Sequence, residues 1–182
     1  MCIRDSSATT PIDRDVVEAM KPYMTDVFGN ADSVHFYGRA AAAAVDEARR
    51  TIADAINASH TEIYFTSGGT EANNWAIKGV AFESLQKNIK KRIITSAIEH
   101  PSLLESVEFT EKLGFENVIL PVNRDGIVEP EILENALKSG AALVSVMTAN
   151  NEIGTVQDIK RLAGIAHSYG ALFHTDAVQA VC

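Results

Sequence analysis

The sequence has little cysteine, no long apolar run and no surplus of basic residues. Its two cysteines, Cys2 and Cys182, stand at opposite ends of the 182 residues. That placement argues against a disulfide framework and favours a reducing, cytoplasmic compartment. No apolar run approaches the roughly 18 residues that a membrane-spanning helix needs. Residues 1–6 also lack the hydrophobic core of a secretory signal, so we expect no membrane partner.

The balance of charge argues against direct binding to nucleic acid. The formal net charge is −8, whereas nucleic-acid binding proteins present a clustered basic face. The densest basic run, residues 87–92, is interrupted by Asn88 and Ile89. We interpret it as a solvated helix end followed by the start of a strand. Hydrophobic residues make up 46% and charged residues 22%, which is typical of a globular domain with a sizeable core.

The apolar pattern alternates between helix-like and strand-like segments. The expected helices cover residues 15–24, 39–58, 70–85, 101–113, 130–138 and 156–169. The expected strands cover residues 62–67, 92–97, 118–122, 142–148 and 171–175. Residues 29–38 look like a loop, and the connections elsewhere are short. Repeated strand–helix units of this kind predict an α/β fold with a mainly parallel sheet and flanking helices.

Polar residues follow four of the expected strands at the point where each strand ends. In open α/β sheets, ligands bind outside the carboxyl ends of the strands, so these residues belong to one rim. They are residues 67–72, residues 99–101, residues 150–152, and Asp176 with Gln179.

A glycine-rich turn follows the first expected strand. Gly68, Gly69 and Thr70 precede a helix, an arrangement that aims backbone N–H groups and a hydroxyl at an anion. The alternative is a tight turn that merely needs glycine. Both the P-loop pattern and the G-x-G-x-x-G fingerprint are absent, which disfavours a nucleotide-binding Rossmann domain.

Asp176 and His100 each allow a functional and a structural interpretation. A carboxylate at the mouth of a buried strand is costly unless it is paired, and a protonated pyridine nitrogen would be a suitable partner for Asp176. The alternative for Asp176 is a helix N-cap. His100 could stack on an aromatic cofactor and move protons, or it could be a structural loop histidine.

Two amides complete the set. Asn151 and Gln179 could hydrogen-bond a ring substituent such as a phenolic oxygen, although amides also satisfy loop backbone. A phosphate cradle, a stacking ring, an aspartate for a ring nitrogen and two amides together describe pyridoxal 5'-phosphate. No metal site is expected.

At this point the sequence resembles the cysteine desulfurases of the class V aminotransferase group, in their housekeeping and nitrogen-fixation branch. The most specific matching stretches are Thr-Ser-Gly-Gly-Thr-Glu-Ala at residues 66–72 and Asn-Asn-Glu-Ile-Gly at residues 150–154. Further matches, in family order, lie at residues 8–11, 28–30, 33–38, 99–100 and 174–179. The resemblance implies the type I pyridoxal-phosphate fold, of which residues 7–182 would form a partial large domain.

The resemblance also implies a role for each candidate residue. Gly69 and Thr70 would hold the cofactor phosphate, and Asp176 would pair with the pyridine nitrogen. His100 would stack on the ring and act as the catalytic acid–base group. The remaining cofactor-binding residues would be the two amides, Asn151 and Gln179.

The family's reaction follows from the same resemblance. It converts L-cysteine to L-alanine and leaves a persulfide on an enzyme cysteine. The sulfur then passes to iron–sulfur scaffold proteins or to other sulfur acceptors, including those of tRNA thiolation. Family members are homodimers.

Three departures from the family pattern qualify that expectation. The family's Schiff-base lysine follows a Ser-x-His stretch, but no lysine follows Lys160 here. Cys182 stands where a glycine is expected, and we do not interpret it as the persulfide cysteine. Residues 1–6 fit poorly and are expected to be a non-native or poorly ordered leader. We therefore expect the chain by itself to be inactive.

Two alternatives stay open. Another class V enzyme, a selenocysteine lyase or an aminotransferase, would share these motifs. A non-catalytic module could keep the same fold without the chemistry.

Overall fold

The computed structural model describes residues 10–181, so the leader expected at residues 1–6 and both cysteines lie outside the described residues. The described chain divides into two compact units, residues 10–65 and residues 66–181. The assignment of residues 7–182 to one partial large domain stays a prediction. Within residues 10–181, no helix is both long enough and apolar enough to cross a membrane.

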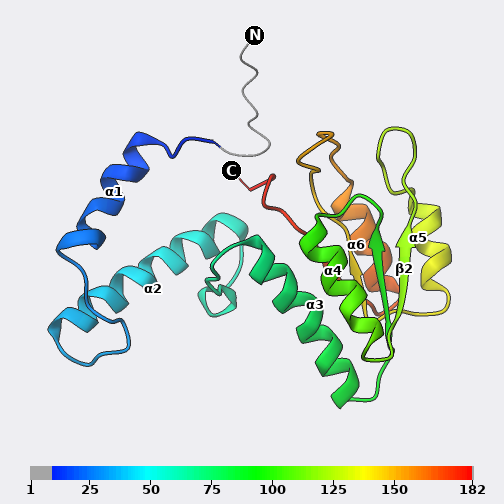
Figure 1. Cartoon of the computed structure of the whole chain (residues 1–182), viewed down its shortest axis with the longest axis horizontal. Coiled ribbons are helices and arrows are strands. Elements are labelled where there is room, and N and C mark those ends of the chain that lie inside the picture. Colours follow the sequence, from blue (N-terminus) through cyan, green and yellow to red (C-terminus); the bar gives the residue numbers. More distant parts are fainter. Residues whose placement is uncertain (1–9, 182) are drawn as a thin grey trace, which may run out of the picture. The chain divides into compact units, whose positions relative to one another are not determined.

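The first unit is helical. It contains α1 (Arg14–Thr25), α2 (Phe36–Ile56) and the short 3₁₀ helix η1 (His60–Glu62), all visible in Figure 1. Both helices expected here are confirmed, but α2 begins before residue 39. The reason is its N-cap: the ring nitrogen Nδ1 of His35 accepts the N–H of Gly38, which satisfies a free donor of the first turn.

The strand expected over residues 62–67 is wrong. Residues 63–66 have no regular secondary structure. The carbonyl of Ile63, which would face a neighbouring strand, accepts the Nε–H of Arg49 at 3.1 Å. The Arg49 guanidinium also lies over the ring of Phe65, 5.3 Å from its centroid. Contacts with α2 therefore take the place of strand pairing in this segment.

The second unit contains a sheet of four parallel strands in the order β2-β1-β3-β4. Central Ile94 of β1 pairs with Val118 on one side and Val144 on the other. The other four expected strands are therefore confirmed, with β3 and β4 shorter than expected. Their bounds are β1 (Arg92–Ser96), β2 (Glu116–Leu120), β3 (Leu143–Ser145) and β4 (Leu172–His174).

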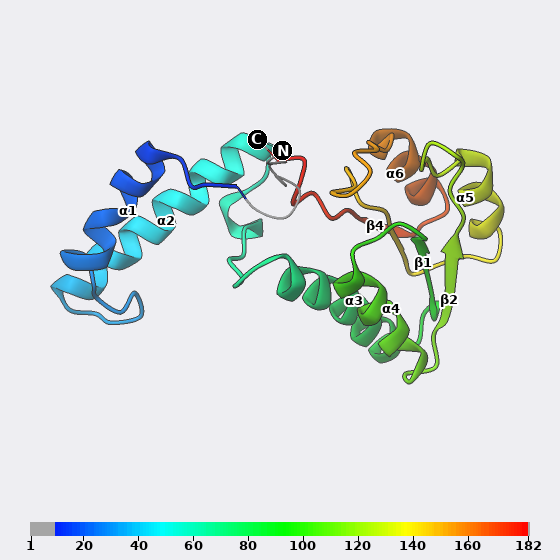
Figure 2. The ribbon, with the colours of Figure 1, turned by 45° about the horizontal axis from the view of Figure 1, so that its top comes forward.

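Helices cover both faces of this sheet, as Figure 2 shows. One face carries α3 (Gly69–Gln86) and α4 (Pro101–Glu111), and the other carries α5 (Pro130–Leu137) and α6 (Ile159–Ser168). All four expected helices are confirmed. Helix α6 begins later than expected because Val156 forms an antiparallel bridge with Ala149 and Asp158 then caps the helix.

Two apolar cores hold the layers together. Neighbouring strand residues point to opposite faces, so Ile93 packs with Ile77 and Leu103 of α3 and α4. Ile94 packs with the α5 and α6 side, and both isoleucines are fully buried. A strand covered on both faces can be apolar at successive positions, which explains why Ile93 and Ile94 follow one another in β1.

The chain reverses its direction across the sheet between β1 and β3. It leaves β1 through α4 to the outer strand β2, and returns past β1 through α5 to reach β3. The helices that follow the two strands, α4 after β1 and α6 after β3, lie on opposite faces of the sheet. Such a switch point is where doubly wound sheets bind ligands.

The first testable prediction concerns the buried core. Ile94→Ala removes a fully buried side chain and should lower the free energy of unfolding by about 2–5 kcal/mol. The matched control is Ile119→Ala on β2, where the side chain is half exposed, and it should cost under about 1 kcal/mol. Urea denaturation of both variants checks this; equal losses would contradict the description of the core.

Candidate functional site

The amino end of α3 lies against the turn that follows β4. A Cβ atom added to Gly69 would lie 3.0 Å from Cγ2 of Val178, so glycine matches this close approach. Gly68 provides no side-chain cap, and the first intrahelical bond runs from the N–H of Ala72 to the carbonyl of Gly68. The earlier N–H groups of α3 therefore meet no helical carbonyl. Thr70 adds an exposed hydroxyl at the same place.

One acidic side chain lies in this first turn. The Oε2 atom of Glu71 accepts both the backbone N–H and the hydroxyl of Ser67, each at 2.7 Å. These two bonds hold the pKa of the Glu71 carboxyl below its usual value. The carboxylate is thereby tied to the residue before the glycines.

Asn73 is a buried amide that joins three segments. Its Nδ2 group donates to Oδ2 of Asp176 at 2.8 Å and lies 3.3 Å from Oγ of Ser102. Asn73 stands four residues after Gly69 and four before the buried Ile77, so all three share one face of α3. At the carboxyl edge of the sheet, this face of α3 therefore carries the hydrogen-bonded amide of Asn73 instead of an apolar side chain.

Asp176 is half-buried, and hydrogen bonds hold both its side chain and its backbone. Its Oδ1 atom accepts the N–H of Val178 at 3.0 Å, while its carbonyl accepts the N–H of Thr148 at 2.9 Å. Oδ1 thus closes the turn at residues 178–180, whereas the helix of the N-cap alternative is not found within residues 10–181. Oδ2 points to Asn73, and no cation forms an ion pair with Asp176 within residues 10–181.

His100 caps α4 through its ring, and the residue is exposed. Its Nδ1 atom accepts the N–H of Ser102 at 3.1 Å and lies 2.8 Å from the Ser102 hydroxyl. A nitrogen that accepts a backbone N–H carries no proton, so the neutral ring has its proton on Nε2. The structural and the functional interpretation of His100 are therefore compatible, because the cap orients the exposed ring.

These bonds form one continuous network. It runs from His100 through Ser102 and Asn73 to Asp176, and crosses from the start of α4 through α3 to the end of β4. Gly69 lies beside it through its approach to Val178. Three of the predicted site positions thus meet at the carboxyl edge of the sheet.

The two predicted amides do not join this network. Asn151 lies half-buried in a turn whose N–H groups are bound by Oδ1 of Asn150, and Gln179 is exposed in the turn after β4. Within residues 10–181, neither side chain hydrogen-bonds another predicted site residue. Their roles stay predictions.

Glu99 is a buried carboxyl that the sequence interpretation left without a role. It is 5% exposed, and its Oε1 atom accepts the Ser96 hydroxyl at 2.6 Å and the Met147 N–H at 2.8 Å. Burial raises its pKa to about 7, the charge of Asp176 adds to the rise, and the two hydrogen bonds oppose it. The available signal was its position: an acidic residue beside His100 at a strand end.

Asn73 and Ser102 were also missed as network members. Asn73 occupies the helix face defined by Ile77 and Ala81, both fully buried. A polar residue in register with core positions is a sign of a buried hydrogen bond. That spacing could have pointed to Asn73, whereas nothing in the sequence indicates that Ser102 meets it.

His174 lies within β4 below Asp176. Its Nδ1 atom is 2.8 Å from the hydroxyl of Ser145 on β3, which ties the two strands. Burial lowers the pKa of His174, and the charge of Asp176 acts in the opposite direction. We interpret His174 as a structural residue that holds the end of β4 against β3.

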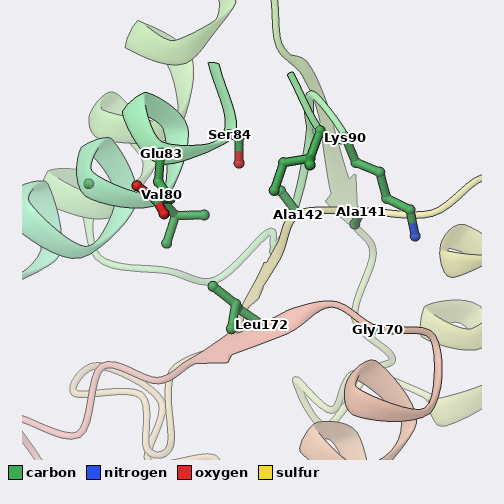
Figure 3. A pocket seen from close by; sticks show the side chains of 10 residues that line it. Val80, Glu83, Ser84, Lys90, Ala141, Ala142, Gly170 and Leu172 are labelled. Atoms are coloured by element: carbon green, nitrogen blue, oxygen red, sulfur yellow. The ribbon is translucent and has the colours of Figure 1, made fainter. Parts of the chain in front are cut away.

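A hollow lies at the opposite, amino edge of the sheet, and Figure 3 shows the side chains that line it. It has a volume of about 640 Å³ and an apolar wall that includes Val80, Ala142 and Leu172. The hydroxyl of Ser84 is buried there without a hydrogen-bond partner among residues 10–181. No network of titratable groups like that at the carboxyl edge lines this hollow.

Comparisons of the sequence with known proteins agree on one family. The sequence profile described as aminotransferase class-V matches residues 3–182. A cysteine desulfurase of Dictyoglomus turgidum is 54% identical over 177 residues, which is 97% of this chain and 44% of that protein. One of Methanosarcina thermophila is 51% identical over 97% of this chain and 43% of its own length.

Solved structures agree with these sequence matches. A structure described as SspA in complex with cysteine has a TM-score of 0.91 at 39% identity and covers 97% of this chain and 50% of its own. A NifS-like protein has a TM-score of 0.92 at 37% identity, covering 97% and 48% respectively. The chain therefore spans about half the length of the relatives it matches. These matches confirm the resemblance and the expected fold.

Glu99 gives stability a defined pH dependence. Its pKa rises from 4.5 when unfolded to about 7 when folded. The stabilisation that comes from its protonation is full below pH 4.5 and is lost as pH rises through 7. Relative to Glu99→Gln, the chain should lose up to about 3 kcal/mol of unfolding free energy across this window. Urea titrations at several pH values measure it, and parallel curves for the two proteins would refute it.

Proposed function

Because the chain belongs to the aminotransferase class-V family, we propose that it is the cofactor-binding part of a pyridoxal-phosphate-dependent cysteine desulfurase. The complete protein would convert L-cysteine to L-alanine and pass the sulfur, as a persulfide, to an iron–sulfur scaffold or another acceptor. Relatives named as cysteine desulfurases and a similar structure that contains cysteine support this reaction.

The observation that carries the proposal is the network at the carboxyl edge. It joins His100 to Asp176 through Ser102 and Asn73, at the switch point of the sheet. Enzymes of this family use pyridoxal phosphate, so the site must suit an anionic phosphate and a cationic aromatic ring.

The residues present fit that cofactor. The uncapped start of α3 at Gly69 and Thr70 offers N–H groups and a hydroxyl to a phosphate. Asp176 offers a carboxylate that no described cation occupies, which suits a protonated ring nitrogen. His100 offers an exposed, oriented ring for stacking.

The chemistry divides between the cofactor and the chain. Pyridoxal phosphate, when bound, supplies an electron sink for the substrate's α-carbon. Asp176 would keep the proton on the ring nitrogen, and Asn73 would hold the carboxylate in place through its 2.8 Å bond. His100 would hold or move a proton at Nε2, since Nδ1 is engaged by Ser102. Asn151 and Gln179 would contact the ring oxygen and the substrate.

The substrate, location and assembly of the complete protein belong to the same proposal. Selenocysteine lyase or aminotransferase activity would use the same residues. We favour cysteine as the substrate because the relatives are named cysteine desulfurases. We propose a cytoplasmic homodimer, on the resemblance and on the composition set out above.

Cofactor binding tests the roles of the two central residues. Asp176→Asn should weaken binding of pyridoxal phosphate about tenfold or more, because a charge-assisted bond is lost. His100→Ala should weaken it as well, through lost stacking. The controls are Asp125→Asn and His167→Ala, both at exposed positions. Equilibrium dialysis with the absorption spectrum measures binding; equal affinities in all five proteins would contradict the assignment.

Turnover is a separate test. The 182 residues contain no lysine beyond Lys160 and no Ser-x-His-Lys stretch. Mixed with pyridoxal phosphate and L-cysteine, the chain should release alanine and sulfide no faster than the free cofactor does. Clear release above that background would show that a covalent lysine of the family type is not required.

A further inference from the structure

One buried carboxyl joins the β1–α4 turn to the end of β3. The Oε1 atom of Glu99 accepts the hydroxyl of Ser96, at the last residue of β1, and the N–H of Met147, beyond β3. Close by, Nδ2 of Asn150 donates to the carbonyl of Ile98 at 2.8 Å. These links cross the switch point between the two strands, directly before His100.

The other oxygen of this carboxyl is buried and unsatisfied. Within residues 10–181, Oε2 of Glu99 has no hydrogen-bond partner, and Glu99 forms no ion pair. An unpaired charge at such a place costs several kcal/mol in general. A proton on Oε2 removes that charge and leaves Oε1 as the carbonyl oxygen for both existing bonds.

The charged and titratable groups around Glu99 favour the same state. Asp176, after β4, is the anion whose charge acts on Glu99. His174 of β4 is buried, and burial favours its neutral form. His100 follows in the chain with Nδ1 committed to Ser102. An ionised Glu99 would place a second negative charge near Asp176 with no described cation to balance it.

We propose that Glu99 is a positioning residue that works as a neutral acid: it fastens the β1–α4 turn to β3 and so fixes the position of His100. Its neutrality leaves Asp176 as the anion available for a ring nitrogen. The roles of His100 and Asp176 toward the cofactor rest on the proposed function, whereas the link between Glu99, Ser96 and Met147 does not.

Nuclear magnetic resonance of the full chain tests this without cofactor. The side-chain carboxyl carbon of Glu99, assigned by its loss in Glu99→Gln, should titrate with a midpoint near 7. Glu99→Gln keeps the shape and the acceptor at Oε1, so the Met147 amide and the His100 ring should keep their positions. Glu99→Ala should displace both signals. Glu105→Gln, at an exposed position of α4, is the matched control.

Binding of pyridoxal phosphate gives the second measurement. Glu99→Ala should weaken it about tenfold, and Glu99→Gln should stay within about twofold of the unsubstituted chain. A Glu99 carboxyl that stays ionised well below pH 7 would overturn the proposal, as would Glu99→Gln losing as much affinity as Glu99→Ala. If Glu99→Ala does not fold, the titration and Glu99→Gln decide. Absence of binding by every protein would contradict the proposed function instead, and the cofactor-free spectra would still decide on Glu99.

Discussion

The parallel pairing of β1 with β3 is the constraint on which the candidate site depends. It places the ends of two strands side by side, although their partners Thr95 and Ser145 lie far apart in the chain. Helices leave these ends toward opposite faces of the sheet. The switch point, the position of the β1–α4 turn with His100 and the hydrogen bonds of Glu99 to Ser96 and Met147 all follow from this arrangement.

Most of the polar groups at the carboxyl edge of the sheet are hydrogen-bonded to one another, and a few are not. The His100–Ser102–Asn73–Asp176 network is hydrogen-bonded throughout, whereas one oxygen of Glu99 is not. The exposed ring of His100 and the uncapped start of α3 remain available at the same edge. A site that must accept a charged ring and a phosphate requires this combination of fixed and available groups.

Local patterns in the sequence predicted most of the fold and part of the site. Apolar periodicity and Pro101 identified four strands and all six helices, because these signals act over a few residues. The strand predicted over residues 62–67 was wrong because Arg49, outside the segment, donates a hydrogen bond to the Ile63 carbonyl. Asn73 and Glu99 escaped notice because their partners, Asp176 and Met147, are 103 and 48 residues away. Such pairings depend on the sheet order, which no local pattern contains.

The most direct measurement of the central claim is a map of where pyridoxal phosphate binds. Amide resonances of the isotopically labelled chain would be followed as the cofactor is added. Binding at the carboxyl edge should shift Gly69, Thr70 and the residues around His100 and Asp176 most strongly. The largest shifts at Ser84, Ala142 and Leu172, in the hollow at the amino edge, would contradict the account.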